Sequence, residues 1–277
     1  MNRKYKIVLI ASVSTIGLFF IFSLTYPVSG EKYESIIKDM QVATNAGLPL
    51  AVPEIVVTHL ATPEAVKAIY MTACVATMPS FREKLVHIAD TTEVNSIIVD
   101  VKDFSGTIAF SATDPLLKDN AGNGCRTRDL REFIAELHEK GIYTIARITV
   151  FQDPYYTKAH PELAVHKRSD GSVWKDHKGL SFVDVSAKPY WDYIVALGKE
   201  SYALGFDELN FDYMRFPSDG DMKDIDFLWS KGMTKPEALE HFFAYLHESL
   251  APIGAKLSVD LFGMTTTTTC FIIRLWL

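Results

Sequence analysis

The chain alternates strand-like and helix-like segments, and this alternation restricts its fold more than any other feature. Five apolar runs are typical of strands, at residues 66–73, 96–103, 143–151, around 209–211 and at 256–262. Helical segments separate most of them. Strict alternation of this kind predicts right-handed parallel βα units. Because no Gly-x-Gly-x-x-Gly motif follows the first strand, a dinucleotide-binding sheet is disfavoured, and a (β/α)8 TIM barrel is the expected fold.

Some of the predicted helices carry signals of their own. Ser80-x-x-Glu83 and Thr234-x-x-Glu237 have the spacing of capping boxes, which predict helix starts. A third helix shows an apolar stripe that ends before Gly141, a residue type common at helix C-termini. The stripe consists of Leu130, Phe133, Ile134 and Leu137. Residues 152–185 are predicted as a long loop.

Polar residues recur at the carboxyl ends of the strands, where TIM barrels build their active sites. Glu208, Asn210 and Asp212 lie in an otherwise apolar strand, so their burial costs desolvation energy and indicates a chemical role. Alternate side chains of a strand share a face, so we expect Asp212 to point toward the barrel axis together with polar side chains of the other strands. The predicted cluster at this mouth consists of Asp100, Lys102, Arg147, Asp212 and Asp260.

This cluster has the residue types that glycoside hydrolysis needs. One carboxyl group protonates the leaving oxygen, and a second, ionised one acts as nucleophile or base. We predict Asp212 as nucleophile or electrostatic stabiliser, kept ionised by Arg147 or Arg215. Asp260 is predicted as the general acid, with Asp100 as the competing choice. The alternative is an inward salt-bridge network that only fills a polar layer.

Aromatic residues in the loops near this mouth suit the apolar faces of sugar rings. They are Phe104, Phe151, Tyr155, Tyr156, Trp174, Tyr213 and Phe216. The residues predicted to bind substrate are Asp100, Lys102, Arg147, Tyr213, Arg215 and Trp174. No metal site or other cofactor is expected, because the histidines lack metal-ligand spacing.

The first thirty residues have the pattern of a signal peptide or a membrane anchor. Arg3, Lys4 and Lys6 precede an uncharged apolar run at residues 7–24, which is long enough to span a bilayer as a helix. We favour the anchor, since no Ala-x-Ala site follows. The expected location is the cell membrane, as a single-pass protein with an extracytoplasmic domain, or the secreted fraction. Residues 31–62 are predicted to be a linker.

The net charge and the number of cysteines restrict the class of binding partner and the disulfide content that we expect. From residue 31 onward the formal charge is −9 and no basic stripe is visible, so nucleic acid is not an expected partner. Three cysteines are too few for a disulfide scaffold. In an exported chain, Cys74 and Cys125 are expected either to form one bridge or to remain two free thiols.

The predicted barrel domain, residues 63–264, contains about five βα units, whereas a complete barrel has eight. Beyond Gly263 the sequence continues with a run of threonines at 265–269 and an apolar end, so residues 265–277 look foreign to the fold. The leading interpretation is a truncation or a reading-frame shift. The alternative is a short sixth strand.

Four motifs in order resemble a known family. They are Val99-Asp-Val-Lys-Asp-Phe-Ser-Gly106, Ile142-Tyr-Thr-Ile-Ala-Arg147, Phe151-Gln-Asp-Pro154 and Gly205-Phe-Asp-Glu-Leu-Asn-Phe-Asp-Tyr-Met-Arg-Phe-Pro217. From about Tyr70 to Gly263 the chain resembles the DUF4015 glycoside hydrolase family of bacterial and archaeal exported proteins. The resemblance implies a barrel related to the glycosidase superfamily, with Asp212 and Asp260 at its acidic strand-end positions.

Three functional hypotheses follow. The first is an anchored, exported glycoside hydrolase that acts on a cell-envelope or extracellular polysaccharide or oligosaccharide. The second is a catalytically inactive carbohydrate-binding barrel. The third is a non-functional fragment that exposes two unpaired sheet edges.

Overall fold

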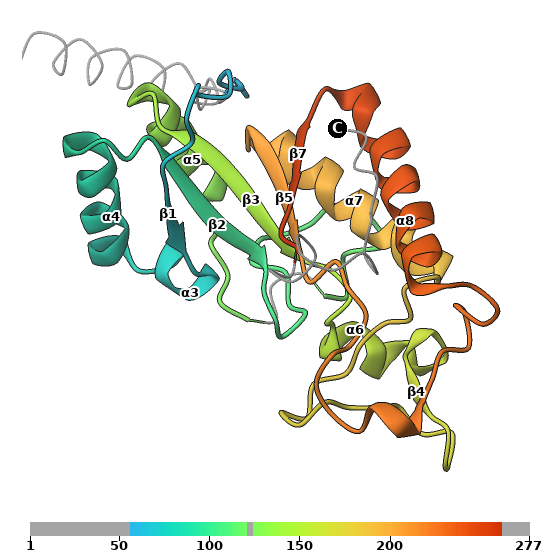
Figure 1. Ribbon diagram of the computed structural model, residues 1–277. Helices are drawn as coiled ribbons and strands as arrows, with labels where there is room; N and C mark the ends of the chain where they lie inside the picture. Colours follow the sequence, from blue (N-terminus) through green and yellow to red (C-terminus); the bar gives the residue numbers. More distant parts are fainter. Residues whose placement is uncertain (1–55, 121–123, 262–277) are drawn as a thin grey trace, which may run out of the picture. The chain divides into compact units, whose positions relative to one another are not determined.

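The computed structural model describes residues 56–120 and 124–261, which form a mixed α/β domain around one parallel sheet (Figure 1). The sheet has five strands in the order β1-β2-β3-β5-β7, and every neighbouring pair is parallel. Its strands are β1 (Ala68–Met71), β2 (Ser96–Lys102), β3 (Tyr143–Thr149), β5 (Glu208–Asp212) and β7 (Lys256–Val259). The predicted alternation and parallel pairing are therefore confirmed for these five strands.

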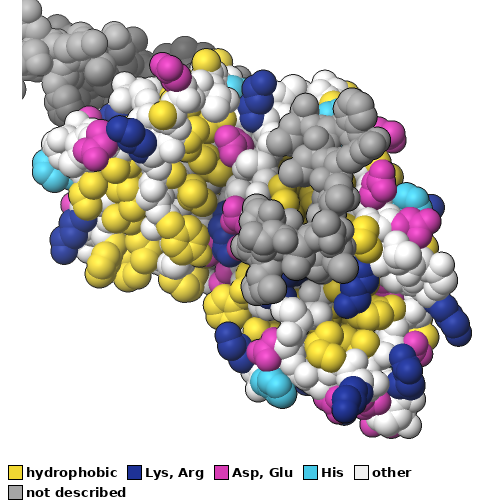
Figure 2. Space-filling view, in the orientation of Figure 1, with side chains coloured by type: hydrophobic (Ala, Val, Ile, Leu, Met, Phe, Trp, Pro, Cys, Tyr) yellow, Lys and Arg dark blue, Asp and Glu magenta, His cyan; other side chains and the backbone are white. Residues whose placement is uncertain are grey.

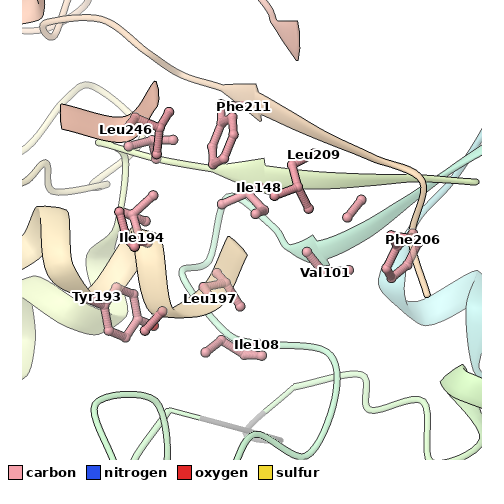
Figure 3. Close-up of a cluster of buried hydrophobic side chains, with 14 of the residues drawn as sticks. Val101, Ile108, Ile148, Tyr193, Ile194, Leu197, Phe206, Leu209, Phe211 and Leu246 are labelled. Atoms are coloured by element: carbon pink, nitrogen blue, oxygen red, sulfur yellow. The ribbon is translucent and has the colours of Figure 1, made fainter. Parts of the chain in front are cut away.

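The helices follow the strands in the order predicted. They are α3 (Ala73–Ala76), α4 (Pro79–Thr91), α5 (Leu130–Glu139), α6 (Pro154–Ala159), α7 (Lys188–Leu204) and α8 (Lys235–Leu250), with 3₁₀ turns η1 (Pro161–Leu163), η2 (Met222–Asp224) and η3 (Ala251–Ile253). Figure 3 shows Ile148, Leu209 and Phe211 of the sheet facing Ile194 and Leu197 of α7 and Leu246 of α8. These side chains are buried, so one face of the sheet forms the main core with the helices.

Two helix starts show how capping depends on context. The Thr234–Glu237 capping box is present at the start of α8, as predicted. The Ser80–Glu83 box is wrong, because the N-cap of α4 is Met78, so the helix begins at Pro79, two residues before the start that Ser80 as N-cap predicts. Proline suits the first helical position because its φ angle is already helical and it has no N–H to satisfy. All four residues of the Leu130–Leu137 stripe are buried.

The predicted loop at residues 152–185 contains regular structure. It includes α6, η1 and β4 (His166–Lys167), which pairs with β6 (Ile225–Asp226) in a small antiparallel sheet. This sheet has its own hydrophobic cluster, formed by Val165, Trp174, Phe182 and Ile225. We call the region of β4, β6 and this cluster the small lobe.

The residues before β1 contact the domain from Thr58 onward. The Leu60 amide donates to Oδ1 of buried Asp207 at 2.5 Å, and Thr62 Oγ1 lies 3.1 Å from the Tyr143 hydroxyl. His59 stacks on Tyr202 with ring centroids 3.8 Å apart.

The predicted membrane segment, most of the predicted linker and the predicted foreign tail lie outside the described residues. Among the helices of residues 56–120 and 124–261, none is long and apolar enough to cross a bilayer.

Cys74 and Cys125 form a disulfide, which decides between the two alternatives of the sequence analysis. It joins α3 to the segment that precedes α5 and closes a loop with a sequence separation of 51 residues. Replacing both cysteines by alanine should lower the free energy of unfolding by about 2–4 kcal/mol, since a loop of this length gains chain entropy when it is released. Urea unfolding of the two proteins would measure the loss, and an unchanged midpoint would contradict it.

On the face seen in Figure 2, hydrophobic side chains gather over the region of β1, α3 and α4. The exposed apolar residues of this region include Val66, Tyr70, Met78 and Phe81. β1 is one edge of the sheet and β7 is the other among the described strands. The sheet is therefore open at both sides in the part of the chain that the structure describes.

Candidate active site

A cleft of about 470 Å³ lies at the carboxyl ends of the strands. Its walls come from β1, β2 and β3 and from the loops at residues 104, 152, 176–182 and 213–219. The lining residues are Tyr70, Asp100, Phe104, Arg147, Gln152, Asp176, Lys178, Leu180, Phe182, Tyr213, Arg215, Ser218 and Asp219. This is the end of the sheet at which the sequence placed the site.

Strand register brings the predicted polar residues to one face of the sheet. Asp100 pairs with Arg147, and Arg147 pairs with Asn210. Thr149 of β3 is opposite Asp212, and Asn210 is opposite Ser258. Paired residues of parallel strands project to the same side, so the alternation rule placed these side chains correctly.

Arg147 joins two carboxylates at the centre of this face. Its Nη1 donates to Oδ1 of Asp100 at 2.6 Å, and its Nη2 donates to Oδ2 of Asp212. The second oxygen of Asp100 accepts from the Tyr70 hydroxyl, and the second oxygen of Asp212 accepts from the Tyr213 amide at 2.5 Å. A fork of two N–H groups is the geometry in which one guanidinium can hold two acids.

Burial and charge act in opposite directions on the pKa values of Asp100 and Arg147. Burial raises the pKa of the Asp100 carboxyl, and the hydrogen bonds from Tyr70 and Arg147 oppose that rise. Burial works against the charged form of Arg147, but the hydrogen bond to Asp100 and the charges of Asp100 and Asp212 outweigh it and raise its pKa. The guanidinium therefore stays charged, and its hydrogen bond and charge favour the ionised form of Asp100.

Asp260 lies on the same face, one residue beyond the end of β7. Its amide donates to the Phe211 carbonyl at 2.9 Å, and its Oδ1 accepts a long 3.4 Å hydrogen bond from Asn210 Nδ2. The residue is exposed and does not line the cleft. The structure thus brings Asp212 and Asp260 to adjacent strands and the same side of the sheet, with Asp260 at the periphery.

Lys102 does not join this cluster, which corrects the predicted arrangement. A register shift between Asp100 and Lys102 places Lys102 opposite Ile148, on the face that packs against the helices. There Lys102 is fully buried and its Nζ lies 3.0 Å from Oδ2 of Asp153. A β-bulge inserts one residue into a strand and so reverses the alternation beyond it.

Trp174 is also placed away from the cleft. Its ring is 1% exposed and packs on Phe182 in the small lobe, and its Nε1 donates to the Asp221 carbonyl at 2.9 Å. Of the predicted rim aromatics, only Phe104 and Tyr213 line the cleft. Phe151, Tyr156, Trp174 and Phe216 pack in the hydrophobic clusters, and the Tyr155 hydroxyl donates to the Asp119 carbonyl.

Tyr213 has a strained backbone directly after Asp212. Its φ of 54° is the only positive value among the non-glycine residues that the structure describes. The Arg215 guanidinium carbon lies 5.1 Å from the centre of the Tyr213 ring, so both predicted binding residues meet at the cleft wall. Such conformations cost about 1–3 kcal/mol and cluster at functional sites, where neighbouring structure holds them.

Some cleft residues were not predicted from the sequence, among them Tyr70, Gln152, Asp176 and Lys178. Tyr70 could have been found, because it alternates with the buried Met71 on a strand that pairs with β2. The others come from loops, for which no period applies. Within residues 56–120 and 124–261, no group of three or more His, Cys, Asp or Glu side chains is placed to hold a metal ion.

Comparison with known proteins identifies the family of this chain. Residues 68–271 match the DUF4015 family, whose description is "Putative glycosyl hydrolase domain", and the chain belongs to this family. A hypothetical protein from Ruminiclostridium thermocellum is 31% identical with a TM-score of 0.64, over 70% of this chain and 98% of that one. No curated protein matches the chain.

A chitobiase from Flavobacterium johnsoniae shares the fold at 15% identity, with a TM-score of 0.51. The match covers 70% of this chain but only 31% of the chitobiase chain. At this identity the likeness concerns the fold alone. The domain is a mixed α/β fold with a five-stranded parallel sheet among the described residues, and it shares this arrangement with part of the chitobiase.

Proposed function

We propose that this protein is a glycoside hydrolase that cleaves a cell-envelope or extracellular polysaccharide through strand-end aspartates. The observation that carries the proposal is the Arg147 guanidinium, which binds both Asp100 and Asp212. Asp100, Arg147 and Tyr213, the residue after Asp212, line the cleft at the carboxyl ends of the strands. Family membership supports the reaction class.

Asp212 is the nucleophile or the electrostatic stabiliser in this proposal. Its carboxylate is held in place by two donors, Arg147 Nη2 and the Tyr213 amide. Asp260 is the general acid, because its exposed carboxyl accepts only a long hydrogen bond from the neutral Asn210 among the described contacts. Asp100, the competing acid, accepts from a cation and a hydroxyl, which suits an ionised partner of Arg147 better than a proton donor.

The remaining predicted residues divide by their position. Tyr213 and Arg215 at the cleft wall are substrate-binding residues, together with Phe104, whose exposed ring can pack on a sugar face.

The export and anchoring of the domain are part of the same proposal. The Cys74–Cys125 disulfide supports an oxidising compartment, and the apolar run at residues 7–24 supplies the membrane segment.

A panel of extracellular and cell-wall polysaccharides tests this function. The full chain is incubated with each glycan, and released reducing ends and bound glycan are both measured. The proposal expects hydrolysis of at least one glycan. Binding without any hydrolysis would instead establish the carbohydrate-binding barrel, a second candidate that is favoured by one observation: both oxygens of Asp212 already accept hydrogen bonds.

A further inference from the structure

Tyr70 stands at the border between the cleft and the open edge of the sheet. It lies on the edge strand β1, its side of the strand faces the cleft, and the residue is 47% exposed. The Arg147 guanidinium carbon lies 5.5 Å from the centre of its ring. One part of the Tyr70 side chain therefore faces solvent in the cleft, and another part contacts Asp100 and Arg147.

The Tyr70 hydroxyl begins a continuous chain of hydrogen bonds that ends at Asp212. It donates to Oδ2 of Asp100, whose Oδ1 accepts from Arg147. Arg147 in turn donates to Asp212. Each of these links is charge-assisted, and such bonds are about twice as strong as neutral ones.

The Tyr70 hydroxyl acts as a hydrogen-bond donor to Asp100. Burial, together with the hydrogen bond and charge of Asp100, raises the pKa of Tyr70, so the hydroxyl keeps its proton and remains a donor. Asp100 is 2% exposed, and without this donor nothing but Arg147 among its described partners would favour its ionised form. The negative charges of Asp100 and Asp212 together hold the Arg147 guanidinium between the two acids.

We propose that Tyr70 is a positioning residue of the active site with two separable contributions. Its hydroxyl keeps Asp100 ionised and so holds Arg147 against Asp212, while its exposed ring forms a wall of the cleft against which a sugar ring packs. The inference rests on the proposed hydrolase function for its kinetic consequences. The effect on Asp100 does not depend on that function.

Two substitutions separate the contributions. Tyr70→Phe removes only the donor, so kcat should fall about tenfold while KM stays within twofold, since a hydrogen bond to a charged group contributes about 1.5–3 kcal/mol. Tyr70→Ala also removes the ring and should raise KM about tenfold. Asp100 must be ionised for activity, and losing a donor raises its pKa, so the acidic limb of the pH profile should move to higher pH in Tyr70→Phe.

A matched control is available outside the cleft. The Tyr245 hydroxyl on α8 also donates to a carboxylate, that of Asp192 on α7, and neither residue lines the cleft. Tyr245→Phe therefore makes the same chemical change at a distance. It should leave kcat, KM and the pH profile unchanged.

A titration that needs no activity completes the test. The carboxyl carbon signals of the aspartates are followed by NMR in wild type and Tyr70→Phe, with Asp100 assigned from Asp100→Asn. An upward shift of the Asp100 pKa is expected. An unchanged Asp100 pKa would overturn the inference whether or not a glycan is cleaved, whereas a shifted pKa in a protein that cleaves no glycan would refute only the proposed hydrolase.

Discussion

Lys102→Met should destabilise the domain by about 3–5 kcal/mol. Lys102 and Asp153 are both fully buried, with Lys102 Nζ 3.0 Å from Asp153 Oδ2, and removing one partner leaves an uncompensated charge in the core. Asp153 also accepts from the Tyr156 amide at 2.7 Å and from the Tyr190 hydroxyl at 2.9 Å. The pair therefore connects the end of β2 to the start of α6 and to α7.

Urea unfolding at neutral pH measures this loss. Burial raises the pKa of Asp153, and Lys102 opposes that rise. Without Lys102 the acid takes up a proton more readily, so the loss should be smaller at acidic pH, where a protonated Asp153 carries no charge to bury. Lys102→Met combined with Asp153→Asn should recover part of the stability. A loss below about 1 kcal/mol for the single variant would contradict the account of this pair.

Arg147→Met should lower kcat by about 10²–10³-fold on any glycan that the protein cleaves. The substitution removes the cation that Asp100 and Asp212 share, so both carboxylates lose the charge-assisted hydrogen bond that holds them in place. Fixed donors and charges of this kind contribute about 3–4 kcal/mol to transition-state stabilisation when they act directly. Arg147→Lys should retain part of the activity, because lysine keeps the positive charge. It should not restore the activity fully, because a single ammonium cannot reproduce the fork of two N–H groups.

The matched control for this prediction is Arg168→Met. Arg168 donates to the Ile225 carbonyl at 3.1 Å in the small lobe and does not line the cleft. It should leave kcat unchanged. Circular dichroism must show that the Arg147 variants are folded, and a folded Arg147→Met protein with kcat within threefold of wild type would show that Arg147 has no part in catalysis.

The parts of the site that could be predicted from sequence are those governed by strand alternation. Asp100, Arg147, Asp212 and Asp260 lie on one face because a strand exposes every second side chain to the same side and parallel strands align in register. The same rule failed at Lys102, where a single bulge reversed the faces. Nothing in the local composition of β2 marks that bulge.

The positions of loop residues could not be predicted from the sequence either. Trp174 and Phe216 have the composition of a sugar-binding rim, yet Trp174 packs in the small lobe and Phe216 packs against Phe227. Their positions depend on tertiary contacts between segments far apart in the sequence, such as residues 165, 182 and 225. Tyr70, by contrast, does line the cleft but was not predicted, because it looked like an ordinary residue of a short apolar strand.

Asp212→Asn tests the central claim most directly. The amide keeps the size of the side chain and removes its negative charge, so turnover should fall by at least about 10³-fold if Asp212 is the nucleophile, the stabiliser or the base. Binding of the same glycan, measured by calorimetry, should stay within a few-fold of wild type. Release of reducing ends at the wild-type rate by the folded Asp212→Asn protein would contradict the claim that Asp212 takes part in the reaction as its nucleophile or electrostatic stabiliser.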